Sequence, residues 1–324
     1  MTAVTETEAC RPRFALIGAA GYIAPRHMRA IREVGGEIVA ALDPSDNVGI
    51  IDSFFPAADF FVEFERFDRH IDKLRRRERP VDYVTVCSPN YLHDAHVRFA
   101  LRSGAAAICE KPLVLNPWNL DALREIEIES GRRVYSILQL RLHPTIKALR
   151  ESVAAAAGKR YELDLTYVTA RGNWYARSWK GDTDKSGGIA TNIGIHFFDM
   201  LTWIFGPARR SVVHAASPAA AAGRLELARA DVRWFLSIDA AHLPEDARAR
   251  GQRTWRAIDI DGRALEFSEG FGDLHTESYR RILAGEGFGI DEARASIEIV
   301  HRLRGATPEG PAGDSHPMAR AIAP

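Results

Sequence analysis

Cysteine is scarce in this 324-residue sequence, which contains Cys10, Cys87 and Cys109 and no others. An odd number of cysteines, without the spacing of a metal or redox motif, does not fit a disulfide framework. We therefore expect reduced thiols in a reducing compartment.

Excess charge of either sign is also missing, because 43 lysine and arginine residues balance 43 aspartate and glutamate residues. This balance argues against a broad positive surface for nucleic acid or an anionic membrane, although local basic sites remain open. No apolar run approaches the roughly 18 residues that span a bilayer, and the first ten residues do not resemble a secretory signal. We expect a cytoplasmic protein.

The chain is long enough for two domains, and its 46% hydrophobic and 27% charged residues are typical of a soluble globular protein. In the first half, short apolar runs alternate with segments of helical period, which predicts a parallel sheet wrapped by helices. The expected strands are 14–18, 37–43, 60–62, 82–87, 106–110 and 134–139, and the expected helices are 22–34, 65–76, 92–102 and 117–130. We predict an α/β Rossmann dinucleotide-binding domain over residues 11–140, preceded by a flexible tail over residues 1–10.

The second half has a different rhythm, in which strands dominate. The expected helices are one from residue 144, 190–205, 276–284 and 291–303, and the expected strands are 161–170, 211–216, 224–230, 233–240, 254–260 and 263–269. Strands joined by turns pair antiparallel, and Asp261-Gly262 is a strong hairpin signal. We predict an α+β substrate and oligomerisation domain over residues 141–305 with an open, mostly antiparallel sheet. The alanine-rich segment 215–223 is expected to be a loop, and residues 306–324 a loose tail.

The turn after the first strand has the sequence GAAGYIA at residues 18–24. Glycine allows the backbone to approach a pyrophosphate at a helix N-terminus, although the usual G-x-G-x-x-G/A spacing is changed here. Asp43 follows the next strand, where its carboxylate can accept hydrogen bonds from a ribose and would repel a 2′-phosphate. The pattern favours NAD over NADP, and an ordinary turn acid before Pro44 is the alternative for Asp43.

Two later strands of the first half end in polar motifs, SPNYLH at residues 88–93 and EKP at residues 110–112. The carboxyl ends of parallel strands line one ligand crevice, so both motifs face one site. In the second half, a glycine pair at residues 187–188 precedes Asn192 and His196, which lie four residues apart and share one helix face. Asp199 follows and is expected to brace this helix.

Together, these motifs resemble the Gfo/Idh/MocA oxidoreductases over nearly the whole chain. The resemblance implies hydride transfer with NAD, no metal, and a cis peptide bond before Pro112. The cofactor contacts it implies are Gly18, Ala20, Gly21, Tyr22, Ile23, Asp43, Ser88, Asn90, His93, Glu110 and Lys111.

Lys111 and His196 are the expected catalytic residues. Burial beside an oxidised nicotinamide would lower the pKa of Lys111, so that its amine could take the proton of a sugar hydroxyl. His196 is the other candidate base. Relatives usually carry an acid at the position of Asn192, and an amide cannot relay a proton, so the order of Lys111 and His196 stays open.

The loop over residues 171–182, RGNWYARSWKGD, is rich in aromatic rings and cations. Aromatic faces stack on bases and sugars, while arginine and lysine pair with phosphates and carboxylates. The loop favours a nucleotide sugar that carries an acid group, and a loop that packs two subunits is the alternative.

Three strings, at residues 18–27, 138–144 and 171–175, are similar to one branch of the family, the UDP-N-acetylglucosaminuronate 3-dehydrogenases. The branch implies oxidation of the sugar C3 hydroxyl for bacterial surface polysaccharide (O-antigen). Its substrate would be a UDP-sugar acid. NAD would be regenerated on the enzyme by 2-oxoglutarate, or NADH would be released. A second copy of the chain would be a partner in a dimer or tetramer. The implied substrate contacts are Lys111, Gln139, Arg141, His143, Arg171, Asn173, Trp174, Tyr175, Asn192 and His196. A dehydrogenase of another sugar or polyol and a non-catalytic NAD sensor are the alternatives.

Overall fold

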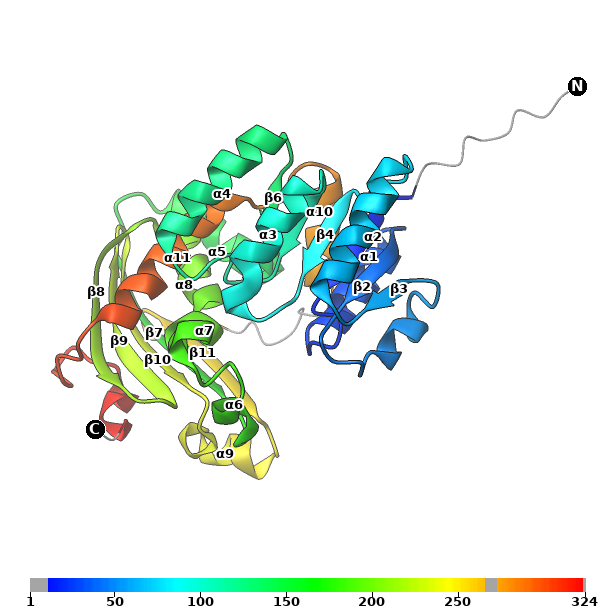
Figure 1. The fold of residues 1–324 in the computed structure, drawn as a ribbon. Helices are drawn as coiled ribbons and strands as arrows, with labels where there is room; N and C mark the ends of the chain where they lie inside the picture. Colours follow the sequence, from blue (N-terminus) through cyan, green and yellow to red (C-terminus); the bar gives the residue numbers. More distant parts are fainter. Residues whose placement is uncertain (1–10, 266–272, 323–324) are drawn as a thin grey trace, which may run out of the picture.

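The computed structural model describes residues 11–265 and 273–322. Two six-stranded sheets organise them, in the orders β3-β2-β1-β4-β5-β6 and β12-β11-β7-β10-β9-β8 (Figure 1). The expected flexible tail over residues 1–10, Cys10 and the end of the expected strand 263–269 lie outside the described residues.

The first sheet is parallel throughout and has helices on its faces, as the alternating pattern predicts (Figure 1). Its strands are β1 (Arg13–Ile17), β2 (Glu37–Leu42), β3 (Asp59–Phe61), β4 (Tyr83–Val86), β5 (Ala106–Cys109) and β6 (Val134–Ser136). Its helices are α1 (Ala24–Glu33), η1 (Gly49–Ser53), α2 (Phe64–Arg76), η2 (Asn90–Leu92), α3 (His93–Arg102) and α4 (Pro117–Ser130). The residues of β1, β4, β5 and β6 are mostly buried, which explains the continuous apolar sequences of these strands.

The second sheet is mixed, with four antiparallel pairs and one parallel pair, β7 with β10. Its strands are β7 (Tyr161–Thr169), β8 (Ala208–Ala216), β9 (Ala220–Leu227), β10 (Ala230–Ser237), β11 (Thr254–Ile260) and β12 (Arg263–Leu265). Asp261 and Gly262 both have positive φ, 53° and 78°, as the predicted two-residue hairpin requires. The mostly antiparallel sheet is confirmed.

Further helices connect the sheets or pack on them. They are η3 (Gln139–Leu142), α5 (Pro144–Ala155), α6 (Trp174–Arg177), α7 (Thr183–Ser186), η4 (Ala190–Gly194), α8 (Ile195–Phe205), η5 (Ala240–His242), α9 (Glu245–Ala249), α10 (Leu274–Leu283), α11 (Ile290–Gly305) and η6 (Pro317–Ala321). None of the helices in the described ranges is both long and apolar enough to cross a bilayer.

The alanine-rich segment 215–223 is not a loop, contrary to expectation. β8 ends and β9 begins within it, and Ala220 and Ala222 are buried. Alanine has a weak strand preference of its own, so packing decides here: the small side chains lie beneath the C-terminal segment in one apolar cluster with Ala319 and Ile322.

The expectation of a loose tail is wrong for residues 306–322. The backbone amides of Glu309 and Gly310 donate to carbonyl oxygens of β8. The His316 ring stacks on Phe235, and its Nε2 lies 3.0 Å from the hydroxyl of Thr166. This segment therefore covers part of the outer face of the second sheet.

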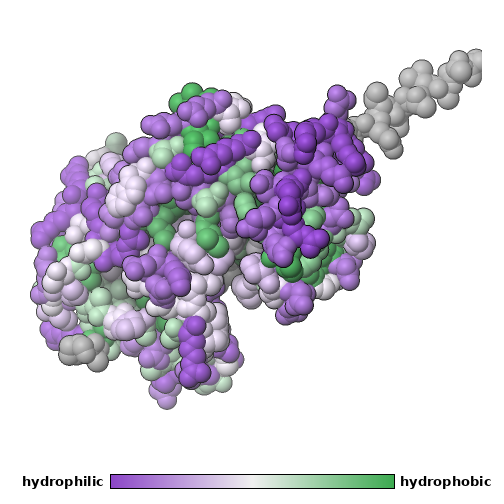
Figure 2. All heavy atoms as spheres, viewed as in Figure 1, coloured by the Kyte–Doolittle hydropathy of each residue, from purple (hydrophilic) through white to green (hydrophobic). Residues whose placement is uncertain are grey.

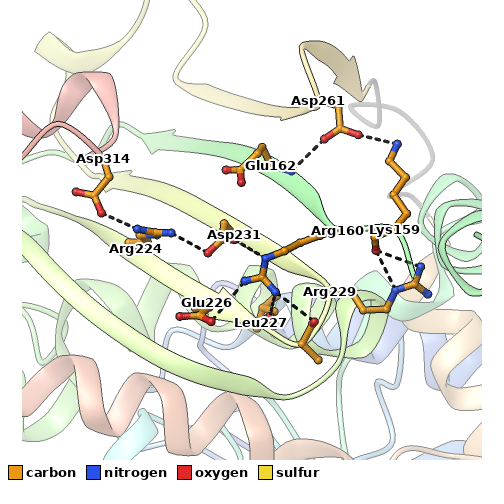
Figure 3. A network of polar contacts seen from close by, with 11 residues as sticks. Lys159, Arg160, Glu162, Arg224, Glu226, Leu227, Arg229, Asp231, Asp261 and Asp314 are labelled. Atoms are coloured by element: carbon orange, nitrogen blue, oxygen red, sulfur yellow. Dashed lines mark hydrogen bonds and ion pairs between the residues drawn. The ribbon is translucent and has the colours of Figure 1, made fainter. Parts of the chain in front are cut away.

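The rest of that outer face carries ion pairs rather than apolar side chains (Figure 3). Arg160 and Arg224 both donate to Asp231, at 2.6 and 2.9 Å, and Arg224 also reaches Asp314 at 2.7 Å. This part of the face is therefore polar in the described residues.

The division of the chain at residue 140 also needs correction, because the chain returns to the first domain. Tyr279 and Ile282 of α10 belong to the same core cluster as Phe14 of β1. The amide of Ser136, on the edge strand β6, donates to the carbonyl of Phe288. Residues 274–288 thus pack on the nucleotide-binding sheet, a contact across more than half the sequence that local patterns do not reveal.

Candidate active site

The glycine turn and Asp43 lie together at the end of the first sheet. Gly18 has φ +88°, and a Cβ there would lie 2.5 Å from the carbonyl carbon of Cys87, so glycine is required. The turn continues through Ala20, Gly21, Tyr22 and Ile23 to α1, and Tyr22 is 86% exposed. Asp43 Oδ2 accepts from the amide of Ala20 at 3.0 Å. The predicted carboxylate is therefore beside the turn.

The motif after β4 is held mainly by contacts within the protein. Ser88 Oγ lies 2.8 Å from His96 Nδ1. His93 places its ring nitrogens 2.6 and 2.8 Å from the carbonyl oxygens of Pro112 and Ser88, so it joins the motifs that follow β4 and β5. Asn90 donates to the carbonyl of Ser186 at 2.9 Å and thereby reaches the second domain. These contacts give His93 a positioning role, and its direct cofactor contact stays a prediction.

Lys111 and Asn192 meet where the two domains join. The Lys111–Pro112 bond is cis, as expected. Lys111 Nζ donates to the carbonyl of Asn192 at 3.0 Å, and Asn192 Nδ2 donates to the hydroxyl of Tyr175 at 2.5 Å. Asn192 lies in the π-helical turn η4, a rare geometry that is frequent at functional sites.

The two expected catalytic side chains influence each other electrostatically. Burial lowers the pKa of Lys111, and Arg171 lowers it further, while Glu110 opposes both effects. Burial and the positive charge of Lys111 hold the pKa of His196 well below its usual range. His196 is therefore neutral near pH 7, and Lys111 is the stronger base of the two.

Residues 139–143 divide into one site residue and two structural ones. Gln139 Nε2 lies 3.3 Å from His196 Nε2, and its buried Oε1 has no hydrogen-bond partner among the described residues. Arg141 instead forms a buried two-bond ion pair with Asp199, at 2.9 and 2.7 Å, and donates to the carbonyl of Glu292. Nε and Nη2 of Arg141 are engaged in these bonds, so Arg141 braces the junction of η3, α8 and α11, and its expected sugar contact stays a prediction. His143 is buried at the start of α5.

The aromatic loop lies against this site. Tyr175 is buried, Trp174 is 53% exposed, and Asn173 is exposed at the start of α6. Lys180 Nζ lies 4.0 Å from the centre of the Trp179 ring. In Figure 2 the surface is hollowed between the first domain and the lobe that carries α6 and α9.

Lys111, Arg171 and Lys180 form a cation cluster, and Lys180 was missed as a site residue from the sequence. Burial lowers the pKa of Lys180 to about 8, and the positive charges of Lys111 and Arg171 act in the same direction. Within residues 11–265 and 273–322, none of the three side chains forms an ion pair with an acid. Three neighbouring cations without an acidic partner can bind an anionic ligand. The signal in the sequence was the W-K pair at residues 179–180.

Glu110 belongs to a buried cluster that the sequence did not predict. Its Oε1 lies 2.8 Å from His27 Nε2 and 3.2 Å from His275 Nε2. The three ligand-type atoms lie within 4.8 Å of one another, close enough for a metal ion. Both nitrogens are nevertheless at hydrogen-bond distance from one carboxylate oxygen, which explains the arrangement without a metal. The carboxylate of Glu110 is thus engaged by histidines.

Comparison with known families matches both halves of the chain. Residues 12–137 match the model of the Gfo/Idh/MocA oxidoreductase family, NAD-binding Rossmann fold, and residues 159–246 match its C-terminal alpha/beta domain. The chain belongs to the Gfo/Idh/MocA oxidoreductase family. The fold class and the family expected from the motifs are confirmed.

Solved structures include a similar protein over nearly the full length. The WlbA (WbpB) dehydrogenase from Thermus thermophilus is 55% identical, with a TM-score of 0.92 over 94% of this chain and 99% of that one, in its complex with NAD and alpha-ketoglutarate. Its complex with NAD and UDP-GlcNAcA gives a TM-score of 0.91 over the same shares.

Curated relatives are more distant and are matched only in part. The D-glucoside 3-dehydrogenase of Escherichia coli K12 is 32% identical over 40% of this chain. The inositol 2-dehydrogenase of Rhizobium meliloti is 29% identical over 63% of this chain. The matches span 38% and 58% of the length of these two relatives, so they indicate the family rather than a shared substrate.

Proposed function

We propose that this protein is an NAD-dependent dehydrogenase that oxidises the C3 hydroxyl of UDP-N-acetylglucosaminuronate to a 3-oxo sugar. The observation that carries the proposal is the pair of cations Arg171 and Lys180 beside the two candidate bases, Lys111 and His196. A neutral polyol has no group that would balance these charges, whereas a sugar acid supplies a carboxylate. The similarity to the Thermus thermophilus enzyme, whose structure contains UDP-GlcNAcA, supports the same substrate.

The glycine turn and Asp43 would hold the cofactor. The turn brings backbone amides to the N-terminus of α1, where a pyrophosphate is favoured, and the Asp43 carboxylate favours a free ribose hydroxyl over a 2′-phosphate. NAD, when bound, accepts the hydride that leaves the sugar carbon.

Lys111 is the proposed general base. As the C–H electron pair leaves C3, the hydroxyl O–H bond breaks, its proton passes to the Lys111 amine, and a C=O bond forms. Lys111 suits this role better than His196 because burial lowers the pKa of Lys111 toward neutral pH, whereas it lowers the pKa of His196 away from neutral pH. His196 and the unpartnered Oε1 of Gln139 would hold the reacting hydroxyl and its neighbours.

The proposal extends to a hydride acceptor, a pathway and an oligomer. 2-Oxoglutarate, also a carboxylate, would use the cation cluster after the sugar has left and return bound NADH to NAD. The 3-oxo sugar would serve bacterial surface polysaccharide.

The exposed Trp174 is a surface that a uracil base or a second copy of the chain would cover. Light scattering of the wild type and Trp174→Ala separates these two, because only loss of a subunit contact lowers the mass.

Absorbance of reduced nicotinamide tests the proposal directly. Purified protein and NAD would be mixed with UDP-N-acetylglucosaminuronate, with UDP-N-acetylglucosamine or with myo-inositol, each with and without 2-oxoglutarate. Of the three compounds, we expect only the acid sugar to reduce NAD. Without 2-oxoglutarate the NADH should form in a single-turnover burst, and with 2-oxoglutarate the oxidation of the sugar should be sustained. Reduction with inositol and not with the acid sugar would support a polyol dehydrogenase. Binding of NAD without reduction by any of the three would support the sensor.

A further inference from the structure

A chain of five buried polar side chains links three separate elements to the catalytic turn. We name it the carboxylate cluster, and its members are Thr85 on β4, Tyr279 and His275 on α10, His27 on α1, and Glu110 after β5. Tyr279 and Thr85 are joined at 2.9 Å, and Tyr279 and His27 Nδ1 at 2.9 Å. Each of the five is at most 6% exposed. Neither the catalytic roles proposed above nor the family motifs explain His27, His275 or Tyr279.

The hydrogen bonds of this cluster have one consistent direction. Burial opposes the charge on Glu110, but the hydrogen bonds from His27 and His275 outweigh it and hold the pKa of Glu110 well below its usual range. An ionised carboxylate only accepts, so His27 must donate from Nε2. Burial lowers the pKa of His27, which is therefore neutral and accepts at Nδ1 from the Tyr279 hydroxyl. Tyr279 in turn accepts from Thr85.

The result is a fixed negative charge beside Lys111. Glu110 Oε1 receives the two histidines, and Oε2 accepts from the backbone amide of Lys111 at 3.2 Å. A neutral His27 satisfies the carboxylate without cancelling its charge. The field of Glu110 therefore still acts on Lys111, where it favours the protonated amine.

We propose that His27, His275 and Tyr279 are positioning residues, which fix the Glu110 carboxylate against the Lys111 turn and so set the proton affinity of the catalytic lysine. The proposal deepens the function above and rests on it only for the catalytic meaning of Lys111. The groups that face Glu110 and Lys111 from packed elements are His27, His275, Tyr279, Cys87, Cys109, His93, His196, Arg171 and Lys180.

The direction of each effect can be derived. In Glu110→Gln the attraction between carboxylate and ammonium is lost, so Lys111 gives up its proton at lower pH. Tyr279→Phe keeps the buried ring but removes the donor to His27, which loosens the hold on Glu110. The pH at which Lys111 loses its proton should shift in the same direction as in Glu110→Gln, by a smaller amount. In a Glu110→Gln background, Tyr279→Phe should add nothing, because it acts through the carboxylate.

The titration of Lys111 is measured without substrate. The full-length protein is pulsed with acetic anhydride across a pH series, and mass spectrometry gives the acetylation of the Lys111 peptide relative to unfolded protein. Tyr135→Phe is the matched control, because Tyr135 is a buried tyrosine of the same core and has no hydrogen bond to this cluster. Thermal unfolding checks that each variant is folded.

We expect the lowest pH midpoint of Lys111 acetylation for Glu110→Gln, with the same value for the double variant. The midpoint of Tyr279→Phe should be higher. Wild type and Tyr135→Phe should share the highest midpoint. A Tyr279→Phe midpoint equal to wild type would overturn the proposal, as would an equal shift in both backgrounds. If the midpoints follow this order but no sugar is oxidised, the function assigned to the site is wrong and the positioning network stands. For an active enzyme, kcat of Tyr279→Phe should fall on the order of 10-fold, because small displacements of a catalytic group are costly.

Discussion

The two polar clusters that meet at Lys111 balance their charges in opposite ways. In the carboxylate cluster, one acid accepts from three donors of the protein, which are His27, His275 and the backbone amide of Lys111. In the cation cluster, Arg171 and Lys180 form no ion pair with an acid within the described ranges, and the acid beside Lys111 is Glu110. The first is complete without a ligand and holds position, whereas the second is completed by an anion. The comparison indicates which buried charges are structural and which recognise substrate.

Removal of Lys111, where the clusters meet, should have the largest effect on activity. Lys111→Ala should lower kcat by about 10²- to 10⁴-fold, the usual contribution of a general base, while NAD binding is retained. Stopped-flow absorbance and NAD titration measure the two quantities. Lys185→Ala is the control, since Lys185 forms an exposed ion pair with Asp182. A Lys111→Ala enzyme with normal turnover would remove the lysine from its assigned role.

Arg141 and Arg171 provide a matched pair that sharpens the contrast. Arg141→Met leaves Asp199 buried without its partner, which should cost about 3–5 kcal/mol of unfolding free energy. Arg171→Met, at an exposed site, should change stability by less than about 0.5 kcal/mol but weaken binding of the acid sugar. Urea unfolding and KM measure both effects. Equal stability of the two variants would contradict the division between structural and ligand-binding charges.

Lys180→Met tests whether the cation cluster selects a carboxylate. A hydrogen bond to a charged group contributes about 1.5–3 kcal/mol, so KM for the acid sugar should rise about 10- to 100-fold. The dissociation constant of UDP-N-acetylglucosamine, which lacks the carboxylate, should change little. A parallel loss on both sugars would mean that Lys180 supports the loop rather than recognising the acid.

The smallest predicted effect is a pH dependence of binding. Burial and the neighbouring cations lower the pKa of Lys180 to about 8, so its positive charge is present below pH 8 and lost above it. Affinity for the acid sugar should therefore fall as the pH rises through about 8, and Lys180→Met should remove that component. Calorimetric titration with the acid sugar at pH values from about 6.5 to about 9.5, on both sides of this pKa, measures the change in affinity. A flat profile in the wild type would show that Lys180 does not face the ligand.

Local sequence signals predicted the nucleotide-binding half well. The glycine turn, Asp43 and the strands of the first sheet follow from periodicity, and the convergence of Lys111, Asn192 and His196 follows from the family motifs. These features depend on residues near one another in the chain or on motifs at strand ends, which the parallel fold brings to one edge.

Contacts between distant segments could not be predicted from local patterns. Arg141 and Arg171 look equivalent in the sequence, yet only Arg141 meets an acid, 58 residues away. Tyr279 completes a cluster with His27 across 252 residues. Burial of Ala319 and Ile322 depends on a neighbouring sheet rather than on the proline- and glycine-rich composition around them. In each case tertiary packing outweighs local preference.

The central claim is oxidation at the C3 carbon of a sugar acid by the Lys111 site. It is tested most directly with UDP-N-acetylglucosaminuronate that carries deuterium at C3, mixed with protein and NAD and followed by mass spectrometry of the nicotinamide and the sugar. The account predicts singly deuterated NADH and a sugar that has lost that deuterium, and neither product with Lys111→Ala. Unlabelled NADH, or a sugar that retains deuterium at C3 while NAD is reduced, would contradict it.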